Sequence, residues 1–162
     1  DGSDNEGFFS QYGRNSVLNI DQLGNDNNFN VLQGGGSNSA RAIQDGNDNY
    51  LGLIQAPLNV GAGNSFRSLQ DGNDNLAGNV QGGFLNDTRV TQDGNDNVQL
   101  GVQFGFANTM RITQDGSDNV SLTIQAPGSA FNVMNVNQNG TAHNAAVLQD
   151  GTSNTVNLTQ NN

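Results

Sequence analysis

The chain has 162 residues, of which 33% are hydrophobic and 12% are charged, and its formal net charge is −10. The charged share is about half that of an average globular protein, and the sequence contains no apolar run of membrane-spanning length. The negative charge argues against nucleic acid as a partner, and the lack of cysteine excludes disulfides and thiolate metal sites.

Glutamine and asparagine recur at a fixed spacing along the whole chain. Fourteen of the fifteen glutamines follow a step of eleven residues, interrupted by two insertions, and six residues before each stands a second marker, usually Asn. The marker pairs are Asn5 and Gln11, Ser16 and Gln22, Asn27 and Gln33, Asn38 and Gln44, Asn49 and Gln55, Asn64 and Gln70, Asn75 and Gln81, Asn86 and Gln92, Asn97 and Gln103, Asn108 and Gln114, Asn119 and Gln125, Asn132 and Gln138, His143 and Gln149, and Asn154 and Gln160. Such a fixed period is typical of a repeat architecture.

Each segment from marker to glutamine is predicted to be a β-strand, because seven residues suit a strand and are too few for a helix. Side chains alternate between the two faces of a strand, so the marker and the glutamine point to the same side. The positions two and four after the marker share that side and are apolar in several segments, as at Met110 and Ile112 or Met134 and Val136. We therefore expect this side to be the interior.

The four residues after each glutamine are predicted to form a turn. A glycine stands two residues after the glutamine in eleven of the thirteen turns, where a positive φ is expected. These turn glycines are Gly13, Gly24, Gly35, Gly46, Gly72, Gly83, Gly94, Gly105, Gly116, Gly140 and Gly151. The two other turns contain Pro57 and Pro127, the only prolines in the chain, and carry the insertions.

Two kinds of turn alternate along the chain, one acidic and uniform (QDGNDN or QDGSDN) and one variable. This alternation implies two strands per coil and a repeat of about 22 residues. The sequence thus predicts a single all-β domain over residues 1–162, a two-sheet β-solenoid of about seven stacked strand-turn-strand coils. The expected units are a half coil at 5–15, repeats at 16–37, 38–63, 64–85, 86–107, 108–131 and 132–153, and a half coil at 154–162.

Stacking about 4.8 Å apart would place the repeated amides in columns, where each can satisfy its neighbours. Charged columns are expected as well. Arg41, Arg67, Arg89 and Arg111 occupy one outward position of alternate strands, and the acidic turns hold Asp26, Asp45, Asp48, Asp71, Asp74, Asp93, Asp96, Asp115 and Asp118. The aspartates are interpreted either as a solvated edge with Asx-turn chemistry or as ligands for Ca²⁺.

Two strands carry apolar residues at outward positions, namely Val98, Leu100 and Val102, and Val120, Leu122 and Ile124. They predict either a lateral contact between filaments or a local bulge that reverses the facing of these strands. The lone histidine, His143, replaces Asn in its column and is interpreted as a structural residue. No catalytic constellation or phosphate loop is visible, so we expect no enzyme and no cofactor.

The repeat resembles that of curlin, the amyloid subunit of bacterial curli fibres, which runs Ser-x5-Gln-x-Gly-x2-Asn-x5-Gln. Ser16, Gln22, Gly24, Asn27 and Gln33 match this pattern residue for residue, and later repeats match with Asn in place of Ser. The repeat from Asn132 departs from the pattern at His143. The resemblance implies secretion to the cell surface of a Gram-negative bacterium, with a nucleator subunit and an outer-membrane secretion machinery as partners and a role in biofilm matrix and adhesion.

The function predicted from the sequence is that of a secreted structural protein that self-assembles head to tail into extracellular cross-β amyloid fibres. The opening residues 1–5 match the end of the acidic turn at 115–119, so the visible start is expected to lie inside a repeat. The alternative is a monomeric β-solenoid binding module for calcium or ice. Ice binding needs a flat outward array of threonines, whereas Thr91 and Thr113 share their expected face with arginines.

Overall fold

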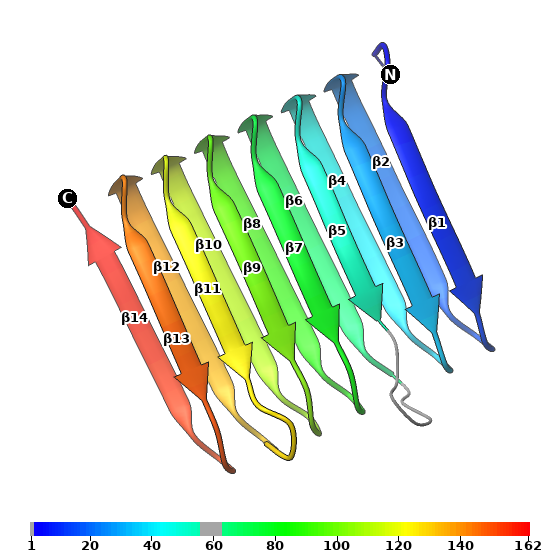
Figure 1. Cartoon of the computed structure of the whole chain (residues 1–162), viewed down its shortest axis with the longest axis vertical. Helices are drawn as coiled ribbons and strands as arrows, with labels where there is room; N and C mark the ends of the chain where they lie inside the picture. The colour runs from blue at the N-terminus through cyan, green and yellow to red at the C-terminus, as the bar shows by residue number, and fades with distance from the viewer. Residues whose placement is uncertain (1, 56–62) are drawn as a thin grey trace.

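The computed structural model describes residues 2–55 and 63–162, which form two parallel sheets of seven strands each (Figure 1). The first, called the odd sheet, contains β1 (Glu6–Tyr12), β3 (Asn28–Gly34), β5 (Tyr50–Gln55), β7 (Leu76–Gln81), β9 (Val98–Gln103), β11 (Val120–Gln125) and β13 (Asn144–Gln149). The second, called the even sheet, contains β2 (Val17–Asn25), β4 (Ser39–Asn47), β6 (Ser65–Asn73), β8 (Asp87–Asn95), β10 (Thr109–Ser117), β12 (Val133–Thr141) and β14 (Thr155–Asn161).

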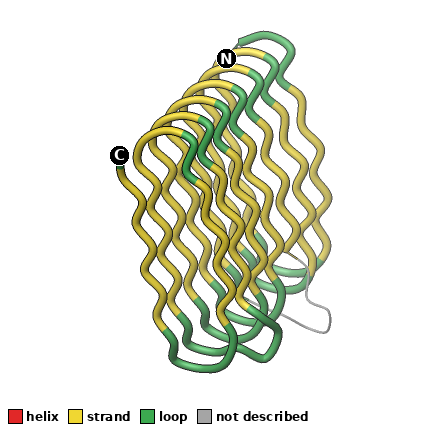
Figure 2. The backbone as a smooth tube through the Cα atoms, turned by 60° about the vertical axis from the view of Figure 1, so that its left-hand side comes forward, coloured by secondary structure: helices red, strands yellow, loops and turns green. Residues whose placement is uncertain are grey.

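Consecutive strands lie in opposite sheets, and each strand pairs in parallel with the strand two further along the chain. The pairing is in register, so that glutamine lies beside glutamine, for example Gln70 beside both Gln44 and Gln92. The chain therefore winds into a flat β-solenoid of about seven coils, which confirms the predicted fold class. Figure 2 shows the two layers and the stacked coils, with the tight turns along one edge and the variable turns along the other.

The two insertions lie in variable turns. The one at Pro57 falls outside the described residues. At the other, Pro127 and Gly128 protrude from the stack, while the carbonyl of Ser129 accepts a hydrogen bond from the N–H of Phe106 at 3.0 Å. Ser129 thereby stands where neighbouring coils place a turn glycine, and the chain returns to register at Asn132.

The core lies between the sheets and includes the fully buried Phe66, Leu51, Met110, Ile112 and Met134. The side predicted to be the interior is buried here, and its residues are apolar in these coils but polar in part of the middle of the odd sheet. There the inward positions of β9 and β11 hold Gln99, Ser121 and Thr123, each no more than 1% exposed. The interior is therefore partly polar, and packing alone does not define it.

The tight turns are shorter than the four residues predicted. Strands of the even sheet continue three residues past the glutamine, as β4 does from Gln44 to Asn47. The bend is made by two residues with positive φ, the predicted glycine and the residue directly before the next marker. Gly46 has φ 115° and Asp48 has φ 54°. Asp and Asn tolerate this left-handed conformation better than most residues, which explains the Asp-Asn pair that closes each acidic turn.

All eleven predicted turn glycines have positive φ. Their second property is the close approach of the next coil. A Cβ built on Gly46, Gly72 or Gly94 would collide with the carbonyl oxygen of the equivalent glycine one coil further along. Glycine is therefore required both by backbone conformation and by stacking.

Replacing Gly94 with Ala is expected to lower the free energy of unfolding by at least about 2 kcal/mol, because strained φ and overpacking each cost about 1–3 kcal/mol. The matched control is Gly128→Ala, where φ is 88° but nothing lies within 4 Å of the added Cβ. Urea unfolding of freshly prepared monomer measures both. Equal losses in the two variants would contradict a contribution from stacking.

Candidate functional site

All the predicted glutamines except Gln11 form two hydrogen-bonded columns inside the solenoid, one in each sheet. In the even sheet the amide nitrogen Nε2 of each glutamine donates to Oε1 of the glutamine in the next coil. The distances are 2.9 to 3.0 Å for the steps Gln22 to Gln44, Gln44 to Gln70, Gln70 to Gln92, Gln92 to Gln114, Gln114 to Gln138 and Gln138 to Gln160. The odd sheet repeats the pattern at 2.7 to 3.0 Å for Gln33 to Gln55, Gln55 to Gln81, Gln81 to Gln103, Gln103 to Gln125 and Gln125 to Gln149.

Each central glutamine also ties the two sheets together. Besides its neighbour in the column, Nε2 of Gln92 donates to the backbone carbonyls of Leu76 and Asn97, at 2.9 and 3.0 Å. Gln92 is completely buried. A buried amide without partners costs about 1–3 kcal/mol, so these contacts turn a destabilising group into a cross-link.

The predicted asparagines form two further columns, in which side chain and backbone both take part. Oδ1 of Asn75 accepts from the backbone N–H and the Nδ2 of Asn97, both at 3.1 Å. The Nδ2 of Asn75 donates to the carbonyl of Gly94 at 2.8 Å. The contact from backbone N–H to Oδ1 also runs along the even sheet, through Asn38, Asn64, Asn86, Asn108, Asn132 and Asn154. The asparagines therefore fasten each turn to the turn above it.

The two exceptions to Asn keep their place in the columns. The Ser16 Oγ accepts from the N–H of Asn38 at 3.2 Å, as an Asn Oδ1 would. The N–H of His143 donates to Oδ1 of Asn119 at 3.0 Å, and its ring Nε2 lies 3.1 Å from the carbonyl of Asn139. At the first coil, Asn5 is half-buried and accepts from Asn27, whereas Gln11 is exposed and donates to the carbonyl of Ser16.

A fifth column of stacked amide side chains was not predicted from the sequence. Asn25, Asn47, Asn73 and Asn95, three residues after the glutamine in the tight turns, also stack. Their Nδ2 and Oδ1 atoms join at 2.9 to 3.0 Å, and the Oδ1 atoms accept from backbone N–H groups at 3.2 Å. The signal was present in the uniform QDGN sequence, but it was assigned to turn formation alone.

The outer surface of the even sheet carries two parallel columns of opposite charge. Arg41, Arg67, Arg89 and Arg111 are exposed and lie side by side in register, as do Asp45, Asp71, Asp93 and Asp115. Arginine and aspartate on one strand are four residues apart, about 13 Å, whereas like charges on neighbouring strands are only about 4.8 Å apart. Repulsion within each column therefore outweighs attraction between the columns.

The outer surface of the odd sheet is apolar. The outward residues of β5, β7, β9 and β11, called the apolar face, form three columns in register: Tyr50, Leu76, Val98 and Val120; Gly52, Gly78, Leu100 and Leu122; and Ile54, Val80, Val102 and Ile124. Leu100 and Leu122 are 46% and 42% exposed. The six apolar residues singled out in β9 and β11 thus point outward, and the alternative of a bulge that reverses them is wrong.

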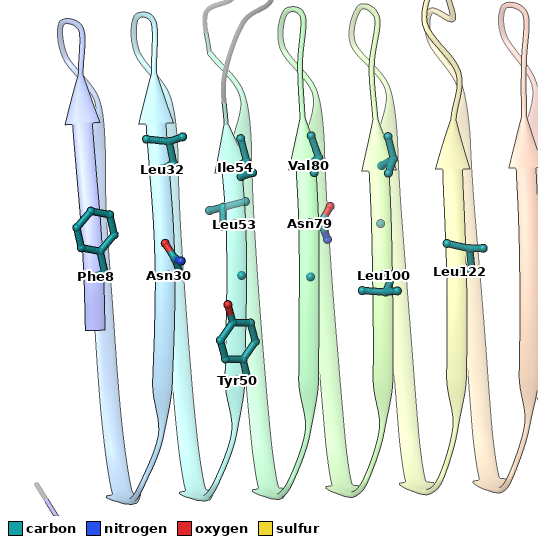
Figure 3. A pocket seen from close by; sticks show the side chains of 14 residues that line it. Phe8, Asn30, Leu32, Tyr50, Leu53, Ile54, Asn79, Val80, Leu100 and Leu122 are labelled. Carbon is teal, nitrogen blue, oxygen red and sulfur yellow. The ribbon is translucent and has the colours of Figure 1, made fainter. Parts of the chain in front are cut away.

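A hollow of about 620 Å³ lies on this face over Gly52 and Gly78, where the column lacks side chains (Figure 3). Its lining is mostly apolar: Tyr50 lies at one end of the hollow along the strands, Ile54 and Val80 lie at the other, and Leu100 borders it on the β9 side. Asn30 borders it on the β3 side. Within the described ranges 2–55 and 63–162, no three His, Asp or Glu side chains gather as metal ligands. The described strands and turns include no helix that could cross a membrane.

Residues 132–161 match the family model of the curlin associated repeat. Over this segment the chain is similar to the curlin repeat. The matched segment covers β12, β13 and β14, and it includes the repeat that departs from the pattern at His143. Curlin repeats belong to a structural, non-enzymatic family associated with extracellular curli fibres. No curated protein and no solved structure matches the chain.

Replacing Gln92 with Ala is expected to lower the free energy of unfolding by about 3 kcal/mol or more, because it leaves Oε1 of Gln114 without a donor, takes one acceptor from Nε2 of Gln70 and leaves a cavity where a completely buried side chain stood. Urea unfolding of the monomer measures the loss, and seeded fibre growth should slow in parallel. The control is Thr91→Ala, one residue earlier on the outer surface, which should change stability by less than about 0.5 kcal/mol. A Gln92→Ala variant as stable as this control would contradict the role of the column.

Replacing Asp93 with Asn is expected to stabilise the fold at low ionic strength by about 0.5–2 kcal/mol, because it removes two like-charge contacts, with Asp71 and Asp115. The matched control is Asp87→Asn, which removes the same charge from a position flanked by Ser65 and Thr109. The difference between the variants should vanish in about 1 M salt. Identical effects at low salt would show that column repulsion is negligible.

Proposed function

We propose that this protein is the subunit of an extracellular, curli-like amyloid fibre and that the fibre grows by head-to-tail stacking of solenoids. The observation that carries the proposal is the state of the two solenoid ends. β1 and β2 at one end, and β13 and β14 at the other, each pair on one side only. Open edges of parallel sheets are templates for further strands.

The end coils also leave inward side chains uncovered. Phe9 occupies the same register position as Val31, yet Phe9 is 57% exposed and Val31 is 1% exposed. The difference arises because Val31 has a coil on both sides and Phe9 has one on a single side. Addition of a further coil would bury such residues and gain about 25 cal/mol for each Å² of apolar surface removed from water.

The backbone has a fixed polarity that suits addition in one orientation. The N–H of the outward residue Val133 donates to the carbonyl of Asn154 in the next coil, at 2.9 Å. By the same alternation, the N–H groups of Thr155, Asn157 and Thr159 point away from β12, toward the place of a following coil. A second copy whose β1 lies on β13 and whose β2 lies on β14 would continue both sheets. This contact is heterologous and does not close into a ring.

The setting of the fibre follows from the similarity to curlin repeats. We propose that the protein is secreted to the surface of a Gram-negative bacterium and contributes there to biofilm matrix and adhesion. A nucleator subunit and an outer-membrane secretion machinery are the proposed partners. The partly polar, low-charge repeat supports this setting, because it leaves assembly to stacking of coils and needs neither cofactor nor disulfide.

Asn157→Pro is expected to fold as a monomer and to stop fibre growth at the β14 end. Proline is tolerated on an edge strand where its N–H would face solvent, but it cannot donate to an added strand. The variant, mixed in small proportion into wild-type monomer, should cap growing ends and lower the elongation rate seen by fluorescence microscopy of single fibres.

The matched control is Asn157→Ala, which loses the same side chain and its 2.7 Å contact with Asn135 but keeps the N–H. It should elongate at nearly the wild-type rate. Normal growth of Asn157→Pro at both ends would overturn the proposed joint, provided that circular dichroism shows its monomer folded.

A further inference from the structure

Head-to-tail stacking covers the ends of the solenoid and leaves its two outer surfaces exposed. On the odd sheet this leaves the apolar face, in which twelve neighbouring outward positions carry only apolar residues, glycine and one tyrosine. Single exposed apolar residues are ordinary, but a contiguous patch of several hundred Å² marks a contact surface. The apolar face therefore calls for a partner that fibre growth alone does not provide.

The chemistry of the face favours another apolar sheet as that partner. It presents neither a charged group nor a carboxamide, whereas the opposite surface of the same solenoid carries the arginine and aspartate columns. A charged partner would have no complementary group here. A second copy of the same face would have the same width, the same flatness and the same lack of polar groups.

The shape of the apolar face is also complementary to that of a second copy of the same face. Along its middle column, Gly52 and Gly78 leave the hollow, and Leu100 and Leu122 stand out beside it (Figure 3). Leu100 leans over Gly78, since its Cδ2 lies 2.8 Å from where a Cβ of residue 78 would be. At Gly52 the ring atom Cε1 of Tyr50 lies 3.3 Å from the same position. The open part of the hollow therefore lies over Gly52 beside the Tyr50 ring, where a side chain from outside can fill it.

We propose that two fibres pair through their apolar faces, related by a two-fold axis parallel to the strands and midway between β7 and β9. The pairing rests on the proposed fibre. The axis exchanges β5 with β11 and β7 with β9, so that Leu122 of one chain enters the hollow over Gly52 of the other. Around this contact Ile54 meets Ile124 and Val80 meets Val102. The two fibres run in opposite directions.

A two-fold axis along the fibre would give a poorer fit. Each strand would then oppose its own copy, placing Leu122 against Leu122 and Gly52 against Gly52. The first contact is overpacked and the second leaves the hollow empty, and both cost stability. Matching large to small residues thus selects the antiparallel pair.

The size of the face indicates when pairing occurs. The four strands of the apolar face, at about 4.8 Å spacing and about 20 Å length, cover roughly 380 Å² per chain, or about 770 Å² for two. Specific protein interfaces start at about 1,200 Å². The contact in a single pair of chains is therefore below this size, whereas fibres repeat the contact with every subunit and gain avidity. Pairing accompanies fibre formation and is weak between monomers.

Mass per length, measured by scanning transmission electron microscopy of assembled fibres, tests the pairing. One chain has a mass of 17.0 kDa and contributes about 33 Å of fibre at about 4.8 Å per coil. Wild-type fibres should contain two chains per 33 Å. Leu122→Asp should reduce this twofold, to one chain, with unchanged elongation rate. Thr113→Asp, which places the same charge on the outer surface of the even sheet, should keep two chains.

A size exchange tests the orientation. Gly52→Leu fills the hollow and should also give single fibres, because Leu would then face Leu122. The double variant Gly52→Leu/Leu122→Gly exchanges knob and hole across the same axis and should restore paired fibres. Restoration would not follow from a general effect of either substitution on folding.

The outcomes separate this inference from the proposed fibre. Wild-type fibres with one chain per 33 Å would overturn the pairing and leave head-to-tail growth intact. Paired fibres of Leu122→Asp would show that another surface makes the contact. Failure of the double variant to restore pairs would overturn the antiparallel axis. A wild-type protein that forms no fibres at all would overturn the proposed function itself.

Discussion

Buried carboxamides are the constraint on which the rest of this structure depends. An apolar core can slip by small amounts at modest cost, but a completely buried glutamine has a donor and an acceptor that must both be satisfied. In this solenoid the partner is the same residue one coil away, as for Gln70 and Gln92 at 3.0 Å. The register of the strands follows from this requirement. Any shift would leave buried amides in every coil without hydrogen-bond partners, and each such amide would cost about 1–3 kcal/mol of stability.

The direction of these hydrogen bonds gives the solenoid a polarity. Within each column, from Gln22 to Gln160 and from Gln33 to Gln149, every glutamine but the last donates to the next glutamine toward the C-terminal end. The asparagine Oδ1 atoms accept from the following coil. The two ends of the stack are therefore chemically different and complementary. The same geometry explains why the turns tolerate insertions: the loop at Pro127 leaves the stack, while Ser129 maintains the backbone contacts of the missing glycine. Assembly by continued stacking requires no contact of a new kind.

Sequence periodicity was sufficient to predict the strands, their facing, the two sheets and the glycines with positive φ, because each depends on residues that recur at one spacing. It failed where the structure depends on a neighbour in the stack. The left-handed residue before each marker was missed because its identity varies from Asp48 to Leu85 and Phe131. The polar interior at Gln99 and Ser121 was missed because alternation predicts facing but not what a position can accommodate. The Asn47 column was hidden within a turn motif that already had an explanation.

The central claim is that the amide columns continue from one chain into the next. Helical reconstruction of assembled fibres by cryo-electron microscopy tests it most directly. The account predicts an axial repeat of about 33 Å per chain at about 4.8 Å per coil, with Gln149 stacked on Gln11 of the next copy and Gln160 stacked on Gln22. A fibre whose chains meet through other surfaces, or whose glutamine columns break at every joint, would contradict it.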